Sequence, residues 1–153
     1  MYTREEASQI KQQFWTAFGK YMAPVLSAEG EKINWINYKT GVRLVHFKMD
    51  VSKEAAYIGI EITHKDTVAA TQLYAQFLVL QANLEQSLGE KWHFDPLVED
   101  EHGRAFSTIF CRLQGVNIYN QTTWPQIISF LKPRIINLDH FWSEHKMIFE
   151  LMG

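Results

Sequence analysis

The side chain with the clearest capacity for chemistry is a carboxylate in the middle of a predicted strand. Isoleucines occupy every second position of residues 58–62, which predicts a β-strand with one apolar face. Glu61 lies on the other face, where a carboxylate is seldom found without a partner. We expect the isoleucines to face the core and Glu61 to face a side that is free of helices or lined by solvent.

Three interpretations of Glu61 follow from its predicted neighbours. It could form a structural ion pair across the sheet with His46 or Lys48, which share one face of the preceding strand. It could be a catalytic acid, because perturbed carboxylates gather at active sites. It could also belong to a small-ligand site together with His46 and Tyr57.

The six histidines do not have the spacing of a metal site. His140 and His145 are five residues apart on a predicted helix, so their side chains point about 140° apart. His64, beside Asp66, is a candidate ligand-binding residue or a helix cap. The single cysteine, Cys111, lies in an apolar run and is expected to act as a small buried hydrophobe. We predict no structural metal and no cofactor.

Composition places the chain among folded, water-soluble proteins. Its 153 residues suggest one domain, and 46% hydrophobic with 14% aromatic residues can form a real core. Lysine and arginine number 15 against 17 aspartates and glutamates, a balance that argues against a strong nonspecific nucleic-acid binder. The N-terminus lacks the apolar core of a signal peptide, and no apolar run reaches the roughly 20 residues of a membrane helix. We therefore expect a cytoplasmic protein with no membrane partner.

Periodicity predicts an α+β fold: a mostly antiparallel sheet of about five strands, covered by helices. The expected elements are a helix from a Thr3–Glu6 capping box to Pro24, a meander of strands at 33–38, 42–49 and 55–66, a helix at 69–88, a hairpin at 92–98 and 104–112, and a long helix from 124 onward. Pro96 predicts an edge or bulged strand. Pro133 predicts a break or kink near Leu131 and Lys132.

Several phrases of the chain together carry a family resemblance: Phe14-Trp15, residues 35–41, 60–64, 100–103, 132–134 and 138–142. In this order they resemble a bacterial family known as domain of unknown function 4268, over essentially the whole chain. The resemblance implies a prokaryotic, soluble, single-domain protein. The family has no established activity, so no catalytic residue transfers to this chain. Longer members look like fusions to restriction-nuclease-like domains, which implies an accessory role beside DNA-processing machinery.

The order of helix, three strands and helix is also similar to the core of the PD-(D/E)xK nucleases. Those enzymes use an Asp on the second strand and a Glu-x-Lys on the third to hold Mg²⁺ and activate water. The catalytic candidates here are Asp50, Glu61 and Lys65. Thr63 stands where the lysine belongs, and Lys65 lies about 13 Å along the strand from Glu61. This alternative is therefore a divergent nuclease-like fold, inactive or with a rearranged site, and Mg²⁺ would be its only cofactor.

The five tryptophans could form a stacking platform for single-stranded nucleic acid, but core packing fits them better because no basic groove accompanies them. Nucleic acid as a partner stays open. The leading hypothesis is a non-enzymatic interaction or accessory module. We expect it to associate with itself or with a protein partner through aromatic surface on the sheet or on the long last helix.

Overall fold

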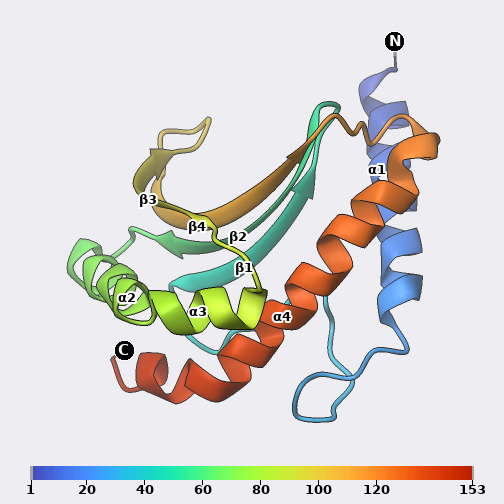
Figure 1. Cartoon of the computed structure of the whole chain (residues 1–153). Coiled ribbons are helices and arrows are strands. Elements are labelled where there is room, and N and C mark those ends of the chain that lie inside the picture. Colours follow the sequence, from blue (N-terminus) through green and yellow to red (C-terminus); the bar gives the residue numbers. More distant parts are fainter. Residues whose placement is uncertain (1, 153) are drawn as a thin grey trace.

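The computed structural model describes residues 2–152, in which a layer of helices covers one face of a single sheet (Figure 1). The elements run in the order α1 (Arg4–Met22), β1 (Val45–Val51), β2 (Ala55–Thr63), α2 (Thr67–Val79), α3 (Gln81–Leu88), β3 (His93–Glu99), β4 (Ala105–Gln114), the short 3₁₀ helix η1 (Gln121–Thr123) and α4 (Trp124–Glu150). The predicted α+β class is confirmed, and so is the capping box of Thr3 and Glu6 at the start of α1.

The sheet is antiparallel throughout, and its strand order is β1-β2-β4-β3. In the described part of the chain it has four strands, so the prediction of about five is wrong. The strand expected at 33–38 is a turn instead. The Asn34 side chain accepts hydrogen bonds from the backbone N–H groups of Ile36 at 3.1 Å and Asn37 at 3.0 Å, which competes with strand pairing. Trp35 is buried there as a single anchor rather than as part of an alternating face.

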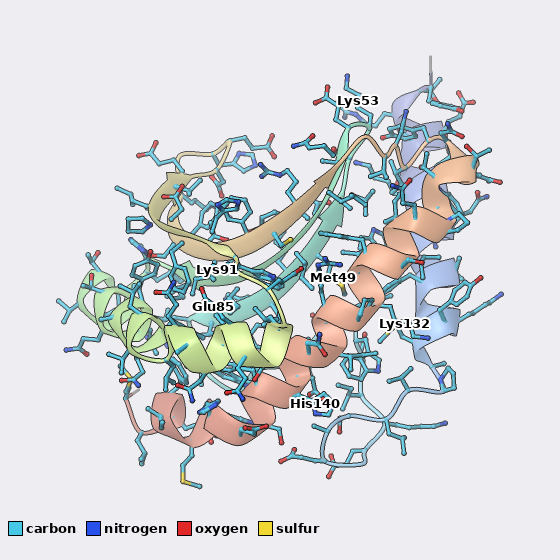
Figure 2. All side chains as sticks on the ribbon, in the orientation of Figure 1. Met49, Lys53, Glu85, Lys91, Lys132 and His140 are labelled. Carbon is cyan, nitrogen blue, oxygen red and sulfur yellow. The ribbon has the colours of Figure 1, made fainter. Side chains whose placement is uncertain are left out.

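The two faces of the sheet have opposite environments. Ile58, Ile60 and Ile62 are fully buried, as predicted, and face the layer of α2, α3 and α4. Met49 of β1 also lies on this side, between the sheet and α4 (Figure 2). No described helix covers the other face, which the hairpin of β3 and β4 overhangs at one side (Figure 1). Glu61 lies on this open face, as the alternation predicted.

Two helix predictions need correction. The helix expected at 69–88 is divided at Leu80, whose backbone leaves the helical region at φ −95° and ψ 15°. Neither glycine nor proline stands there, so tertiary packing imposes the change of direction between α2 and α3. Of the break or kink expected near Pro133, the break does not occur, because α4 continues through Pro133 to Glu150. Pro133 has no N–H for the Ser129 carbonyl, and the Arg134 side chain donates to the neighbouring Phe130 carbonyl at 2.9 Å.

The irregular segment 23–44 is held against α4 by one buried and two partly buried hydrogen bonds. Asp139 accepts from the backbone N–H of Ala28 at 2.7 Å and from the Tyr38 hydroxyl at 2.6 Å. The indole N–H of Trp142 donates to the Thr40 carbonyl at 2.7 Å. A long segment without regular structure is thereby held in one conformation, and it leads directly into β1.

Pro96 has the effect predicted for it. β3 is an edge strand, and its register with β4 shifts between Asp95 and Val98. The hydroxyl of Ser107 donates to the Pro96 carbonyl at 2.8 Å and stabilises this bulge. The bulge positions Asp95 beside the open face. Among the described helices, none combines the length and the apolar character needed to cross a membrane.

Candidate functional site

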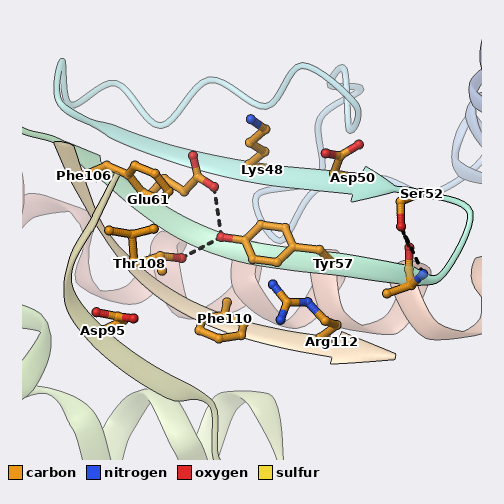
Figure 3. A pocket seen from close by; sticks show the side chains of 12 residues that line it. Lys48, Asp50, Ser52, Tyr57, Glu61, Asp95, Phe106, Thr108, Phe110 and Arg112 are labelled. Carbon is orange, nitrogen blue, oxygen red and sulfur yellow. Dashed lines mark hydrogen bonds between the residues drawn. The ribbon is translucent and has the colours of Figure 1, made fainter. Parts of the chain in front are cut away.

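The open face of the sheet contains a hollow of about 450 Å³ that is lined by all four strands (Figure 3). Lys48 and Asp50 come from β1, Tyr57 and Glu61 from β2, and Asp95 from β3. β4 contributes a row of four side chains: Phe106, Thr108, Phe110 and Arg112. These residues reach one face because alternate residues of a strand point the same way and the register aligns them across the sheet.

The ring of Tyr57 lies along β2 and over Gly59, toward Glu61 (Figure 3). Its hydroxyl donates to Glu61 Oε2 at 2.9 Å. The Tyr57 hydroxyl oxygen also lies 2.6 Å from Thr108 Oγ1. Because the single Tyr57 proton goes to Glu61, the Thr108 hydroxyl donates to Tyr57. Thr108, Tyr57 and Glu61 therefore form a directed chain of hydrogen bonds that fixes the carboxylate in one position.

The electrostatics of the site keep Tyr57 protonated. Burial raises the pKa of the Tyr57 hydroxyl well above its ordinary value, and the nearby negative charge of Glu61 raises it further. The phenol is thus a hydrogen-bond donor at neutral pH. It is not a base.

Arg112 lies at the other end of the hollow and stacks on aromatic rings. Its guanidinium carbon is 5.1 Å from the centre of the Phe110 ring and 5.8 Å from that of Tyr57. The two rings stack on each other, with their centres 5.6 Å apart. Within residues 2–152 Arg112 forms no ion pair, so its donors are free to meet a ligand.

The predicted ion pair of Glu61 is wrong. His46 stands directly opposite Glu61 in the β1–β2 register, and Lys48 lies two residues along. Yet the ion pairs of residues 2–152 are Glu101 with His102 and Glu90 with Arg134. Glu61 is held by the neutral hydroxyl of Tyr57. Sequence reasoning overlooked Tyr57 as this partner because the bond spans four residues along one strand and is not a cross-strand pair.

The three nuclease candidates do not meet. Asp50 pairs in register with Tyr57, whereas Glu61 pairs with His46, so four residues separate the carboxylates, or about 13 Å along the sheet. Asp50 Oδ1 accepts the backbone N–H of Val51 at 2.9 Å. Lys65 is exposed in the turn after β2. Across residues 2–152, no three His, Cys, Asp or Glu side chains converge as metal ligands would.

The two remaining ligand candidates lie outside the hollow. His46 is exposed on the edge strand β1. His64 bonds Ser107 Oγ at 2.7 Å through Nε2, while Asp66 alone provides the cap of α2. Because Ser107 gives its proton to the Pro96 carbonyl, His64 is the donor in this pair. That polarity is the reverse of a histidine that activates a serine nucleophile.

The tryptophans pack in or against the core, which is the role predicted for them in preference to a stacking platform for nucleic acid. Trp35, Trp92 and Trp142 are buried, and Trp15 and Trp124 pack against the same cluster. The aromatic side chains of the open face are instead Tyr57, Phe106 and Phe110. The alternation of Phe106 and Phe110 in the predicted strand 104–112 was a usable signal, but the sequence did not reveal that β4 pairs with β2.

A family model described as Domain of unknown function (DUF4268) matches residues 10–146. The chain belongs to this family. The predicted resemblance is therefore confirmed. No curated protein and no solved structure matches the chain.

Several of the phrases that carried the resemblance to DUF4268 have structural roles. Segments 35–41 and 138–142 meet in the bonds of Asp139 to Tyr38 and of Trp142 to Thr40. Segment 132–134 supplies Arg134, which binds Glu90 through two hydrogen bonds of 2.8 and 2.9 Å. Segment 60–64 differs from these because it directs Glu61 into the hollow on the open face.

Proposed function

We propose that this DUF4268 protein is a non-enzymatic binding module, a single domain that holds a partner protein on the open face of its sheet. One observation carries the proposal: the uncovered face has a hollow in which the charged side chains have no counter-ion in the described chain. Two of these charges, Glu61 and Asp95, are half-buried. Half-buried charges without partners destabilise a protein on its own, so a bound partner that neutralises them gives them a role.

The chemistry of the lining favours binding over catalysis. Tyr57 is a protonated donor, and its neighbour Glu61 is already engaged by it. A protein partner also fits better than nucleic acid. The charged lining residues are the carboxylates Asp50, Glu61 and Asp95 against the cations Lys48 and Arg112, so a polyanion meets an excess of negative charge.

A peptide selection tests the proposal and does not require the identity of the partner. A library of random peptides displayed on phage is selected on the immobilised protein, and enriched peptides are titrated into labelled protein while amide shifts are followed by NMR. We expect the shifts to concentrate on the outward residues of β2 and β4. Shifts confined to the helical side, or no enriched peptide, would overturn the proposal.

A matched pair of charge reversals sharpens this experiment. Arg112→Glu changes a cation of the hollow, whereas Lys11→Glu changes an exposed cation on α1, outside the hollow. The Arg112 variant should weaken binding of the enriched peptides about tenfold or more, as expected for loss of a charge at an interface, and the Lys11 variant should leave it unchanged.

The alternative of a divergent metal-dependent nuclease makes an opposite prediction. It requires Mg²⁺ or Mn²⁺ to bind at Glu61, with Asp50 and Lys65 brought to it by a rearrangement of the sheet. Calorimetric titration of either ion into the native protein should give no Glu61-dependent heat under our proposal. Metal binding that Glu61→Gln abolishes would support the nuclease instead.

Self-association and a link to DNA processing stay predictions. Two hollowed faces leave a gap when they are apposed, so we favour a different protein as the occupant of the open face. Light scattering at micromolar concentration checks self-association, and the genes beside this one check the link to restriction systems.

A further inference from the structure

Four side chains surround Thr108 on the open face. The register places Glu61 of β2 and Asp95 of β3 directly beside Thr108, on opposite sides of it (Figure 3). Phe106 and Phe110 lie two residues before and after Thr108 on β4 and therefore share its face. All five residues line the hollow. We call this group the box: Thr108 is its floor, Glu61 and Asp95 flank Thr108 on the two neighbouring strands, and Phe106 and Phe110 precede and follow it on β4, while the Tyr57 hydroxyl covers part of the floor.

The dimensions of this box suit a single cationic group. Glu61 and Asp95 are two strand spacings apart, so their Cα atoms are separated by about 10 Å. The Tyr57 hydroxyl occupies part of the space beside Glu61, and the remainder opens into the hollow, where an ammonium or guanidinium group can approach both carboxylates. Thr108 itself is buried, and its proton goes to Tyr57, so the floor offers no competing donor.

Both carboxylates of the box retain bonding capacity. Glu61 uses Oε2 for Tyr57, and Asp95 uses Oδ1 for the backbone N–H of Leu97 at 3.2 Å. Their other oxygens accept no hydrogen bond from residues 2–152, and neither carboxylate belongs to an ion pair there. Both side chains are half-buried, so the missing partner matters more than it would at an exposed position.

The aromatic wall formed by Phe106 reinforces the preference for a cation. The face of a phenylalanine ring attracts positive charge. The Phe110 ring already contacts Tyr57 and His93, whereas Phe106 has no aromatic or cationic partner for its ring within residues 2–152. The protein already shows the interaction, because the Arg112 guanidinium stacks over Phe110 from the other end of the hollow. That end also carries Asp50, which lies in the same register row as Arg112 and accepts the backbone N–H of Val51, and Lys48 lies between the two ends. The hollow is therefore acidic around Thr108 and has a cation, Arg112, at its other end.

We propose that the box around Thr108 receives a lysine or arginine side chain of the partner protein, between Glu61 and Asp95. This inference rests on the proposed function and specifies its ligand. Arg112 lies four residues from Thr108 along β4, about 13 Å, which is the span of four residues in an extended chain. The partner segment thus carries a basic residue for the box and an acidic residue about four positions away for Arg112.

The test uses the peptides enriched by selection on the immobilised protein. They should carry a lysine or arginine, and replacing it with norleucine should weaken binding at least about tenfold. The double variant Glu61→Gln, Asp95→Asn keeps the shape and the Tyr57 hydrogen bond but removes both charges, and it should weaken binding by a similar factor. Glu54→Gln is the matched control, because Glu54 is an exposed acid in the turn between β1 and β2 that does not line the hollow.

Each outcome separates the two proposals. Unchanged binding to the open face after norleucine replacement would overturn the proposal that the box receives a cationic side chain, and so would unchanged binding to the double variant. Either result would still be consistent with the proposed binding module. Peptides that never map to the open face would overturn both. A free butylammonium ion that binds as tightly as the peptides would overturn a partner side chain as the occupant. A melting temperature of the double variant that is no lower than that of the wild type shows that any loss of binding is local, because removal of unpartnered charges should not destabilise the free protein.

Discussion

The phenol ring of Tyr57 occupies the space where a side chain at Gly59 would stand. A Cβ atom added to Gly59 would overlap the Tyr57 hydroxyl and lie 2.8 Å from Cζ, and 3.0 Å from Thr108 Oγ1. Glycine in a strand interior ordinarily weakens the strand. Here it allows Tyr57 to lie flat on the sheet, and this position in turn lets the hydroxyl reach both Thr108 and Glu61.

Gly59→Ala should therefore destabilise the protein, although alanine is no worse than glycine in a strand. We expect a loss of about 1–3 kcal/mol in the free energy of unfolding, because the added methyl group displaces Tyr57. Urea denaturation measures it. In a Tyr57→Ala background the same substitution should be neutral or slightly stabilising. An equal loss in both backgrounds would show that the Tyr57 ring is not what excludes a side chain at Gly59.

The raised pKa values of two tyrosines predict a loss of stability in alkali. Burial is the main cause for both Tyr57 and Tyr38, and the charges of Glu61 and Asp139 add to it. The unfolded chain keeps the ordinary pKa of 10.0 and so releases these protons first as the pH rises. The stabilisation is thus full below pH 10 and is lost above it, by up to about 1.4 kcal/mol per pH unit for each tyrosine.

Urea denaturation between about pH 8 and pH 11 checks this prediction, because the range spans the ordinary tyrosine pKa. Tyr57→Phe and Tyr38→Phe should each flatten the alkaline fall in the free energy of unfolding. Tyr21→Phe, at a tyrosine that is 56% exposed, should leave the slope of the wild-type protein unchanged. A wild-type slope retained in all three variants would contradict the assignment.

Asp139 should control the order of segment 23–44. Asp139→Ala leaves the buried hydroxyl of Tyr38 and the backbone N–H of Ala28 without their acceptor, which costs about 2–4 kcal/mol. We expect faster amide hydrogen exchange across residues 25–44 and little change in the sheet. Glu144→Ala on the exposed side of α4 is the control. Equal exchange in the two variants would mean that other contacts hold the segment.

The Glu90–Arg134 pair should require arginine and not only a positive charge. Arg134 donates from Nε and Nη2 to the two carboxylate oxygens, and a lysine cannot form this parallel pair. Arg134→Lys should lower the free energy of unfolding by about 1–2 kcal/mol. Thermal denaturation measures it, with Lys132→Arg as the reciprocal control on the same helix. Equal stability of Arg134→Lys and the wild type would contradict this prediction.

The same pair predicts an acid dependence. Burial alone would raise the pKa of Glu90, but hydrogen bonds from Arg134 and Trp92 outweigh it and hold the pKa below the ordinary 4.5. The stabilisation that ionised Glu90 contributes is therefore fully present above pH 4.5, and it is lost as the pH falls through the lowered pKa of Glu90 in the folded protein. The difference in stability between the wild type and Glu90→Gln should shrink on acidification. A constant difference would show that Glu90 does not titrate in this way.

The sequence by itself determined the parts of this protein that depend on neighbouring residues. The capping box at Thr3, the end of α3 at Gly89, the buried isoleucine row of β2 and the bulged edge strand at Pro96 all follow from local periodicity and backbone preferences. The orientation of Glu61 followed as well, because alternation along the strand alone places its side chain on the face of the sheet opposite to that of Ile60.

Only the tertiary structure decided which residues share the site. The register of β2 with β4 brings Thr108 and Arg112 beside Glu61 and Tyr57, and no local pattern encodes a pairing between segments some 50 residues apart. The structure also decided between competing signals: the Asn34 side chain turns residues 33–38 despite their strand-like composition, and α4 continues through Pro133. The open face became a candidate binding surface because all described helices that cover the sheet pack against its other side.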